Sequence, residues 1–180
     1  MANSMSQMQQ AILQAVLRLT PRPQSLLDIG CGNASFTRVM ASDLPQTSVV
    51  GLDPVLPRRP APRGIRFVVG DVTKLPFDEA SFDVLTSCKS FHHWGDKKAG
   101  LQESYRVLKK GGWLVIGDGL IQGWLDNRVM RWMVKHLDSG DIADYNELVS
   151  MLKSVGFEST SITMIPKSLN SLFLILAQKP

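Results

Sequence analysis

Cysteine is scarce in this chain of 180 residues, which contains only Cys31 and Cys88. The two lie far apart, and neither has the spacing of a metal site, so the sequence favours a reduced, intracellular protein with no bound metal. Long apolar runs are also missing: no stretch of about 18 apolar residues occurs. Residues 1–20 carry no Lys or Arg before Arg18, which argues against a signal peptide. We therefore expect a cytoplasmic protein with no membrane partner.

Internal repeats, low-complexity tracts and linkers are absent as well, so we expect a single domain over residues 1–180. The content of 44% hydrophobic and 20% charged residues excludes the disordered and fibrous classes. On folding, a chain of this length buries roughly 70% of the surface that the unfolded chain exposes. A fold with this much burial needs no disulfide to stabilise it.

Basic residues exceed acidic ones, and the formal net charge is +4. The basic clusters fall at residues 58–66, 97–98 and 109–110. No module that reads RNA or DNA accompanies them, so we interpret them as solvated surface and do not expect nucleic acid as a partner.

The most informative stretch is SLLDIGCGNAS at residues 25–35. Its apolar residues predict a buried parallel strand, Gly30 and Gly32 predict a tight turn, and residues 34–44 predict the next helix. Backbone N–H groups at such a turn approach a ligand closely because no Cβ intervenes. This stretch is therefore the predicted ligand cradle.

A carboxylate follows this turn at the end of the next predicted strand, residues 48–53. Asp53 lies 21 residues after Gly32 (53 − 32 = 21), a spacing that places an acid beside ribose hydroxyls in open parallel sheets. The prolines of residues 54–62 then exclude the helix expected there.

Strand and helix signals alternate along the rest of the chain. Further strands are predicted at residues 65–71, 82–87, 113–118, 159–165 and 172–178. Helices are predicted within residues 1–20, at about 96–108, at 120–137 and from 144 to 155. The connection between the last two strands is so short that they must be antiparallel.

Five segments, in order, resemble the class I S-adenosylmethionine-dependent methyltransferases, in their small-molecule, methyltransferase type 11-like branch. The segments are LLDIGCGNAS, VVGLDP, GDVTKLPFDEASFDVLTSCKSFHHW, ESYRVLKKGGWLVIGD and ELVSMLKSVGFES with its closing hairpin. The resemblance implies an α/β fold with a Rossmann-like, doubly wound, seven-stranded sheet, mostly parallel with an antiparallel last strand. It also implies an N-terminal helix in residues 1–20 and a lid-like helical insertion at residues 120–140, where the family builds its acceptor pocket.

The resemblance further implies S-adenosylmethionine as cofactor, a small, partly apolar molecule as methyl acceptor, and a set of cofactor-binding residues. Asp28 would reach the methionine amino group, Asp53 the ribose, and Asp71 with Val72 the adenine. The remaining predicted contacts are Gly30, Cys31, Gly32, Pro54, Ser87 and Cys88. The chain departs from the family at position 34, where Ala34 replaces a third glycine, and at the proline-rich residues 54–62.

A general base is predicted at His93 or His92, because an imidazole titrates near neutral pH. Two other functions stay open. A nicotinamide-dependent oxidoreductase shares the glycine turn and the ribose acid, although its fingerprint calls for glycine or alanine where Ser35 stands. The other is a cofactor-binding accessory protein without catalysis.

Overall fold

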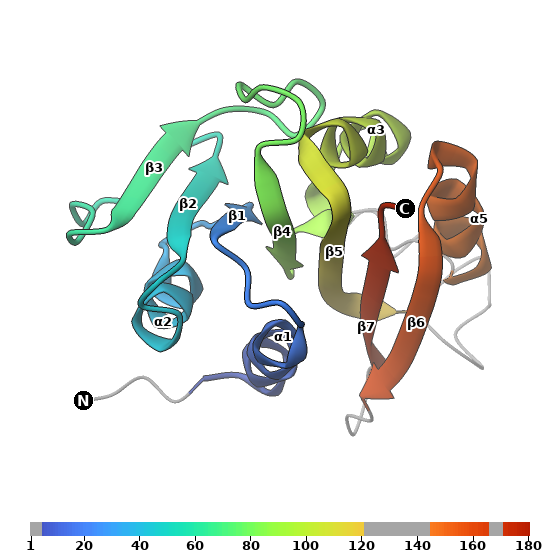
Figure 1. Ribbon diagram of the computed structural model, residues 1–180, viewed down its shortest axis with the longest axis horizontal. Helices are drawn as coiled ribbons and strands as arrows, with labels where there is room; N and C mark the ends of the chain where they lie inside the picture. Colours follow the sequence, from blue (N-terminus) through green and yellow to red (C-terminus); the bar gives the residue numbers. More distant parts are fainter. Residues whose placement is uncertain (1–4, 121–144, 166–170) are drawn as a thin grey trace, which may run out of the picture.

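The sheet at the centre of the molecule joins seven strands in the order β3-β2-β1-β4-β5-β7-β6 (Figure 1). This computed structural model describes residues 5–120, 145–165 and 171–180. The strands are β1 (Ser25–Ile29), β2 (Ser48–Asp53), β3 (Ile65–Val69), β4 (Phe82–Cys88), β5 (Leu108–Leu120), β6 (Glu158–Ile165) and β7 (Ser171–Gln178).

The sheet is parallel except at β7, which runs antiparallel to both of its neighbours, β5 and β6. The predicted Rossmann-like, mostly parallel fold with an antiparallel final strand is thereby confirmed. Because the chain runs outward from β1 through β2 to β3 and then returns to β4, the strand order reverses between β1 and β4. Ligands of open α/β sheets bind at the carboxyl ends of the strands at such a point.

Helices cover both faces of the sheet (Figure 1). They are α1 (Gln7–Arg18), α2 (Ser35–Asp43), α3 (Lys97–Val107) and α5 (Tyr145–Val155), with a single 3-10 turn, η1 (Phe91–His93). The α1 helix begins with a capping box, in which the Ser6 hydroxyl accepts from the Gln9 N–H and the Gln9 side chain accepts from the Ser6 N–H. Asp96 caps α3 in a similar way by accepting from the Ala99 N–H.

Two apolar layers hold the helices on the sheet, and adjacent strand residues alternate between them. Leu26 packs in the layer of α1 and α2, whereas Leu27 packs in the layer of α3 and α5; both are fully buried. This double burial explains why the predicted strand reads as a continuous apolar run.

Two predicted boundaries were wrong. The strand predicted at residues 113–118 begins earlier: β5 starts at Leu108, directly after α3. Its first residues are held by the end of the chain, because Gly111 donates to the Lys179 carbonyl and Lys179 donates to that of Gly112. The strand predicted to reach Asp71 ends at Val69, since Asp71 turns back to bridge Lys74.

The predicted insertion at residues 120–140 lies almost wholly outside the described residues. In the described part of the chain, no helix has the length and apolar character needed to cross a membrane.

Candidate active site

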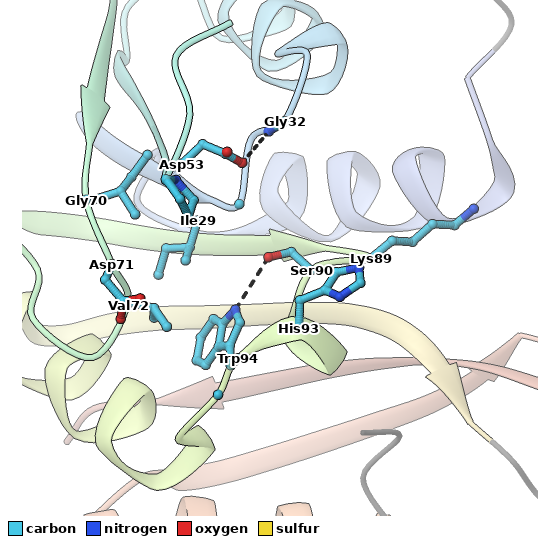
Figure 2. Close-up of a pocket in the computed structure, with 14 residues that line it drawn as sticks. Ile29, Gly32, Asp53, Gly70, Asp71, Val72, Lys89, Ser90, His93 and Trp94 are labelled. Carbon is cyan, nitrogen blue, oxygen red and sulfur yellow. Dashed lines mark hydrogen bonds between the residues drawn. The ribbon is translucent and has the colours of Figure 1, made fainter. Parts of the chain in front are cut away.

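A cavity of about 370 Å³ opens at the carboxyl ends of β1, β2 and β4, beside the residues that follow β3 (Figure 2). This volume lies in the range of small-molecule sites. The lining residues are Ile29, Gly30, Gly32, Leu52, Asp53, Pro54, Gly70, Asp71, Val72, Lys89, Ser90, His93, Trp94 and Gly95. Seven of the twelve predicted site residues are therefore brought together: Gly30, Gly32, Asp53, Pro54, Asp71, Val72 and His93.

The glycine turn after β1 forms one wall of this cavity through left-handed backbone. Gly30 has φ +74° and Gly32 has φ +53°. The N–H groups of Gly30 and Cys31 donate to the Leu52 carbonyl at 2.8 and 3.0 Å, which fixes the turn against β2. Ala34, the N-cap of α2, has φ +60°, so this position demands the left-handed conformation that glycine adopts without strain.

Asp53 joins the glycine turn to the segment after β2. Its Oδ2 accepts the Gly32 N–H at 2.8 Å (Figure 2). Its Oδ1 accepts the Val55 N–H at 3.1 Å. The carboxylate is thus oriented by backbone donors at the rim of the cavity, as a ribose-binding acid requires.

Asp71 lies on the other side of the cavity and is exposed. One carboxylate oxygen accepts both the Thr73 hydroxyl at 2.6 Å and the Thr73 N–H at 2.7 Å, and these hydrogen bonds lower the pKa of Asp71. Val72 beside it is buried and offers an apolar surface to the same cavity.

The segment after β4, from Lys89 through η1 to Trp94, supplies lining residues that were not predicted from the sequence. Lys89 has φ +53°, and its side chain leads away from Asp53 and Asp71 in Figure 2. The Trp94 indole N–H donates to the Ser90 hydroxyl at 3.4 Å, and both side chains are buried. Their position directly after a strand in the middle of the sheet is the signal that could have identified them.

Asp28 does not line the cavity, although it precedes the turn. The carboxylate is buried and accepts the Thr37 hydroxyl at 2.6 Å and the Thr86 hydroxyl at 3.0 Å. Burial raises the pKa of Asp28 to about 6, against the opposing effect of these two hydrogen bonds. Its contact with a methionine amino group stays a prediction.

The raised pKa of Asp28 predicts a specific dependence of stability on pH. The native state binds a proton below about pH 6, whereas the unfolded chain binds it only near 3.8, so this group stabilises the fold at low pH and loses that contribution as pH rises through 6. Asp28→Asn removes the buried charge. The free energy of unfolding of this variant at pH 7.5 should therefore be up to about 3 kcal/mol higher than that of the native protein. Denaturant unfolding of both proteins at pH 7.5 and 4 measures this difference. An equal difference at the two pH values would contradict it.

Cys31, Ser87 and Cys88 also lie outside the lining. Burial raises the pKa of both thiols to about 12, which keeps them neutral and argues against thiolate chemistry. Ser87 is fully buried, and its hydroxyl oxygen has no hydrogen-bond partner among the residues that the structure describes. Backbone contacts from these three residues to the cofactor remain predictions.

The two histidines of η1 have different surroundings. His93 lines the cavity and is exposed. The His92 ring lies next to that of His93, with the two ring centroids 3.9 Å apart. His92 Nδ1 is 2.8 and 3.0 Å from the two carboxylate oxygens of Asp118 at the end of β5.

Asp118 contacts both the backbone N–H and the ring of His92. Its Oδ2 accepts the His92 N–H at 3.0 Å, and its Oδ1 accepts the Gly119 N–H at 2.8 Å, while the side chain is almost fully buried. The carboxylate thus favours the tautomer that carries the proton on Nδ1, in which Nε2 is the basic nitrogen. The sequence argument did not identify Asp118 as a site residue.

Residues 27–116, half of the chain, match the family described as "Methyltransferase domain". The chain belongs to this methyltransferase family. The predicted membership is confirmed, and with it S-adenosylmethionine as the cofactor.

Two curated relatives of this methyltransferase are demethylmenaquinone methyltransferases. That of Thermotoga maritima is 30% identical over 169 residues, 79% of this chain and 73% of the relative. That of Deinococcus radiodurans is 37% identical over 106 residues, 54% of this chain but only 44% of the relative.

A solved structure supports the fold of this methyltransferase. The phosphoethanolamine N-methyltransferase 2 of Haemonchus contortus, in complex with S-adenosyl-L-methionine, has a TM-score of 0.79 at 17% identity. The match covers 96% of this chain and 52% of that chain. At this identity the likeness concerns the fold alone.

Proposed function

We propose that this methyltransferase transfers a methyl group from S-adenosylmethionine to a small, partly apolar acceptor and gives S-adenosylhomocysteine. The observation that carries the proposal is the cavity at the carboxyl ends of the strands, with an oriented carboxylate, Asp53, on one side and a histidine held by a buried carboxylate beside it. The bound cofactor supplies an electrophilic methyl group, so the protein mainly has to align the acceptor and exclude water.

The lining residues fit this cofactor. The left-handed turn at Gly30 and Gly32 leaves backbone next to the cavity, where a methionine or ribose group would lie. Asp53 would bind the ribose hydroxyls, and Asp71 with Val72 would hold the adenine. Two carboxylates on the lining also suit a ligand that carries a positive sulfonium.

His92 is the proposed general base. As the nucleophilic atom of the acceptor forms its bond to the methyl group and the carbon–sulfur bond breaks, a proton of the acceptor would pass to Nε2 of His92. Asp118 stabilises the imidazolium that results and keeps the ring in place. His93, which lines the cavity, would contact the bound cofactor.

The acceptor is proposed to be an aromatic hydroxyl compound of the hydroquinone class. A phenolic hydroxyl carries a proton that an imidazole can accept, and the curated relatives above are named for a quinone substrate. Because the chain matches the methyltransferase family, a nicotinamide-dependent oxidoreductase is no longer an alternative function. A non-catalytic accessory protein is the remaining alternative.

Substitution of His92 tests the assignment of the base. His92→Ala should lower kcat by 10²-fold or more with a naphthoquinol acceptor, and Asp118→Asn at least tenfold, because each removes the oriented imidazole. The affinity for S-adenosylhomocysteine should change less than threefold in both, since neither residue lines the cavity. Transfer of labelled methyl groups and calorimetry measure the two quantities.

His93→Ala is the matched control for this experiment, because it removes the adjacent imidazole but leaves the His92–Asp118 pair intact. It should retain more activity than His92→Ala. Unchanged kcat in both His92→Ala and Asp118→Asn would contradict the base assignment. Tight cofactor binding by the native protein with no turnover of any naphthoquinol or catechol would favour the accessory protein instead.

A further inference from the structure

The positive charge of the chain is concentrated in one segment. Residues 54–70 contain four arginines, Arg58, Arg59, Arg63 and Arg66, and no acidic residue. The whole chain has 20 basic and 16 acidic residues, so the remainder has 16 of each and no net charge. The net charge of +4 thus equals that of the connection between β2 and β3 together with β3 itself.

The same segment exposes apolar side chains. Among the residues that the structure describes, the exposed large hydrophobic ones are Val55 (72%), Leu56 (53%) and Val69 (55%). All three fall within residues 54–70. Arg58, Arg59, Arg63 and Arg66 are exposed beside them. Basic and apolar side chains are therefore exposed along one segment of the chain. Residues 55–66, which contain Val55, Leu56 and the four arginines, are called the basic loop.

Hydrogen bonds hold the backbone of the basic loop. The Val55 N–H donates to Asp53, and Nη2 of Arg38 on α2 donates to the carbonyls of Arg59 and Pro60 at 3.0 Å each. The Ile65 N–H closes the loop by donating to the Pro62 carbonyl at 3.1 Å. The loop leads into β3, the outer strand at the left of Figure 1. Its side chains are therefore displayed by a fixed backbone at the edge of the molecule.

We propose that the basic loop docks this protein on an anionic lipid surface. Val55 and Leu56 insert among the headgroups, while the arginines bind lipid phosphates and keep their charge in water. The expectation of no membrane partner rested on the lack of a long apolar run, which tests for spanning segments only.

Lipid fits these observations better than a macromolecular partner. Two adjacent exposed aliphatic side chains add nothing to the binding of nucleic acid phosphates, and no aromatic side chain is exposed there for base stacking. A stable protein interface buries about 800 Å² on each partner around a packed apolar centre, which three aliphatic side chains do not supply. Insertion in a bilayer interface needs only a few apolar side chains and nearby cations.

The basic loop is also next to the cofactor. Val55, Leu56, Arg58 and Arg59 line a second cavity of about 540 Å³, which shares Gly32 and Asp53 with the cofactor cavity. Docking through this loop would therefore bring the mouth of the active site to the lipid surface. The inference does not depend on the proposed acceptor, because lipid binding is measured without methyl transfer.

Co-sedimentation of the full chain with vesicles tests the proposal. The protein should bind phosphatidylcholine vesicles with 30% phosphatidylglycerol at least 20-fold more tightly than pure phosphatidylcholine vesicles in about 0.1 M salt, given roughly fivefold per arginine near such a surface. The triple variant Arg58→Gln, Arg59→Gln, Arg63→Gln should bind the anionic vesicles about 100-fold more weakly. The double variant Val55→Ser, Leu56→Ser should bind the anionic vesicles about tenfold more weakly than the native protein.

The matched control removes the same number of positive charges outside the basic loop. Lys74, Lys98 and Lys110 are exposed and lie outside the loop, and their replacement by Gln should reduce vesicle binding less than fivefold. Circular dichroism checks that each variant is folded. An equal loss in the lysine control, no effect of the Val55 and Leu56 changes, or tighter binding to duplex DNA or polyglutamate than to anionic vesicles would overturn the proposal.

Discussion

Asp53→Ala is expected to weaken the binding of S-adenosylhomocysteine by 10²-fold or more. In the structure the carboxylate is held by the N–H groups of Gly32 and Val55 at the rim of the cavity. Two ribose hydroxyls would donate to it in the complex, and hydrogen bonds to a charged group contribute about 1.5–3 kcal/mol each. Titration calorimetry of the variant and the native protein measures the loss.

Asp43→Ala provides the control for Asp53→Ala. Asp43 is an exposed carboxylate at the end of α2, where it lines a separate cavity away from the cofactor. Its removal should leave the affinity within twofold of the native value. A similar, small change in both variants would mean that Asp53 does not bind the ribose, and a thermal unfolding scan would separate this from a loss of structure.

Gly30→Ala is expected to destabilise the fold severely and to abolish cofactor binding. A Cβ at this position would overlap the Ser90 hydroxyl and lie 2.5 Å from the Ser90 Cβ, and φ is +74°. Rotation of the Ser90 hydroxyl would not relieve the contact with the Ser90 Cβ, so the turn or η1 must shift. A cost of about 3 kcal/mol or more follows, which lowers Tm by roughly 6–12 °C in a domain of this size.

Gly32→Ala measures the cost of left-handed backbone without the steric overlap with Ser90. Gly32 also has positive φ, +53°, but a Cβ there would meet no atom within 4 Å. Its stability loss should be limited to the strain of about 1–2 kcal/mol. The double variant Gly30→Ala, Ser90→Gly should recover part of the lost Tm. Equal losses for Gly30→Ala and Gly32→Ala, without this recovery, would show that Ser90 does not constrain the turn.

The sequence predicted the parts of the fold that depend on local pattern. The continuous apolar runs marked β1, β2 and β4, and the short final connection required an antiparallel pair. Asp53 was recognised from its distance to Gly32 alone, because parallel strands bring their carboxyl ends to one edge of the sheet. These features depend on spacing along the chain and on the alternation of strand and helix.

The direction of individual side chains could not be predicted in this way. Asp28 precedes the turn, yet its carboxylate points into the interior to meet Thr37 and Thr86 rather than toward the cavity. His92 and Asp118 are 26 residues apart, and only the adjacency of β4 and β5 brings them together. The early start of β5 depends on Lys179 near the end of the chain.

The charge of the basic loop could be counted from the sequence, but the exposed apolar side chains beside it could not be predicted. The sequence shows four arginines among prolines, whereas only the structure shows that Val55 and Leu56 are exposed beside them. Apolar residues after a buried strand would ordinarily be expected to pack inward. The prolines exclude the crossover helix that would have buried them.

A crystal structure with bound S-adenosylhomocysteine tests the account most directly. We predict that the ribose hydroxyls contact the Asp53 carboxylate, that the adenine lies beside Asp71 and Val72, and that the methionine group lies along the turn at Gly30. The sulfur should face His93, with His92 and Asp118 still joined behind it. A ligand bound elsewhere, or in this cavity without contact to Asp53, would contradict the account.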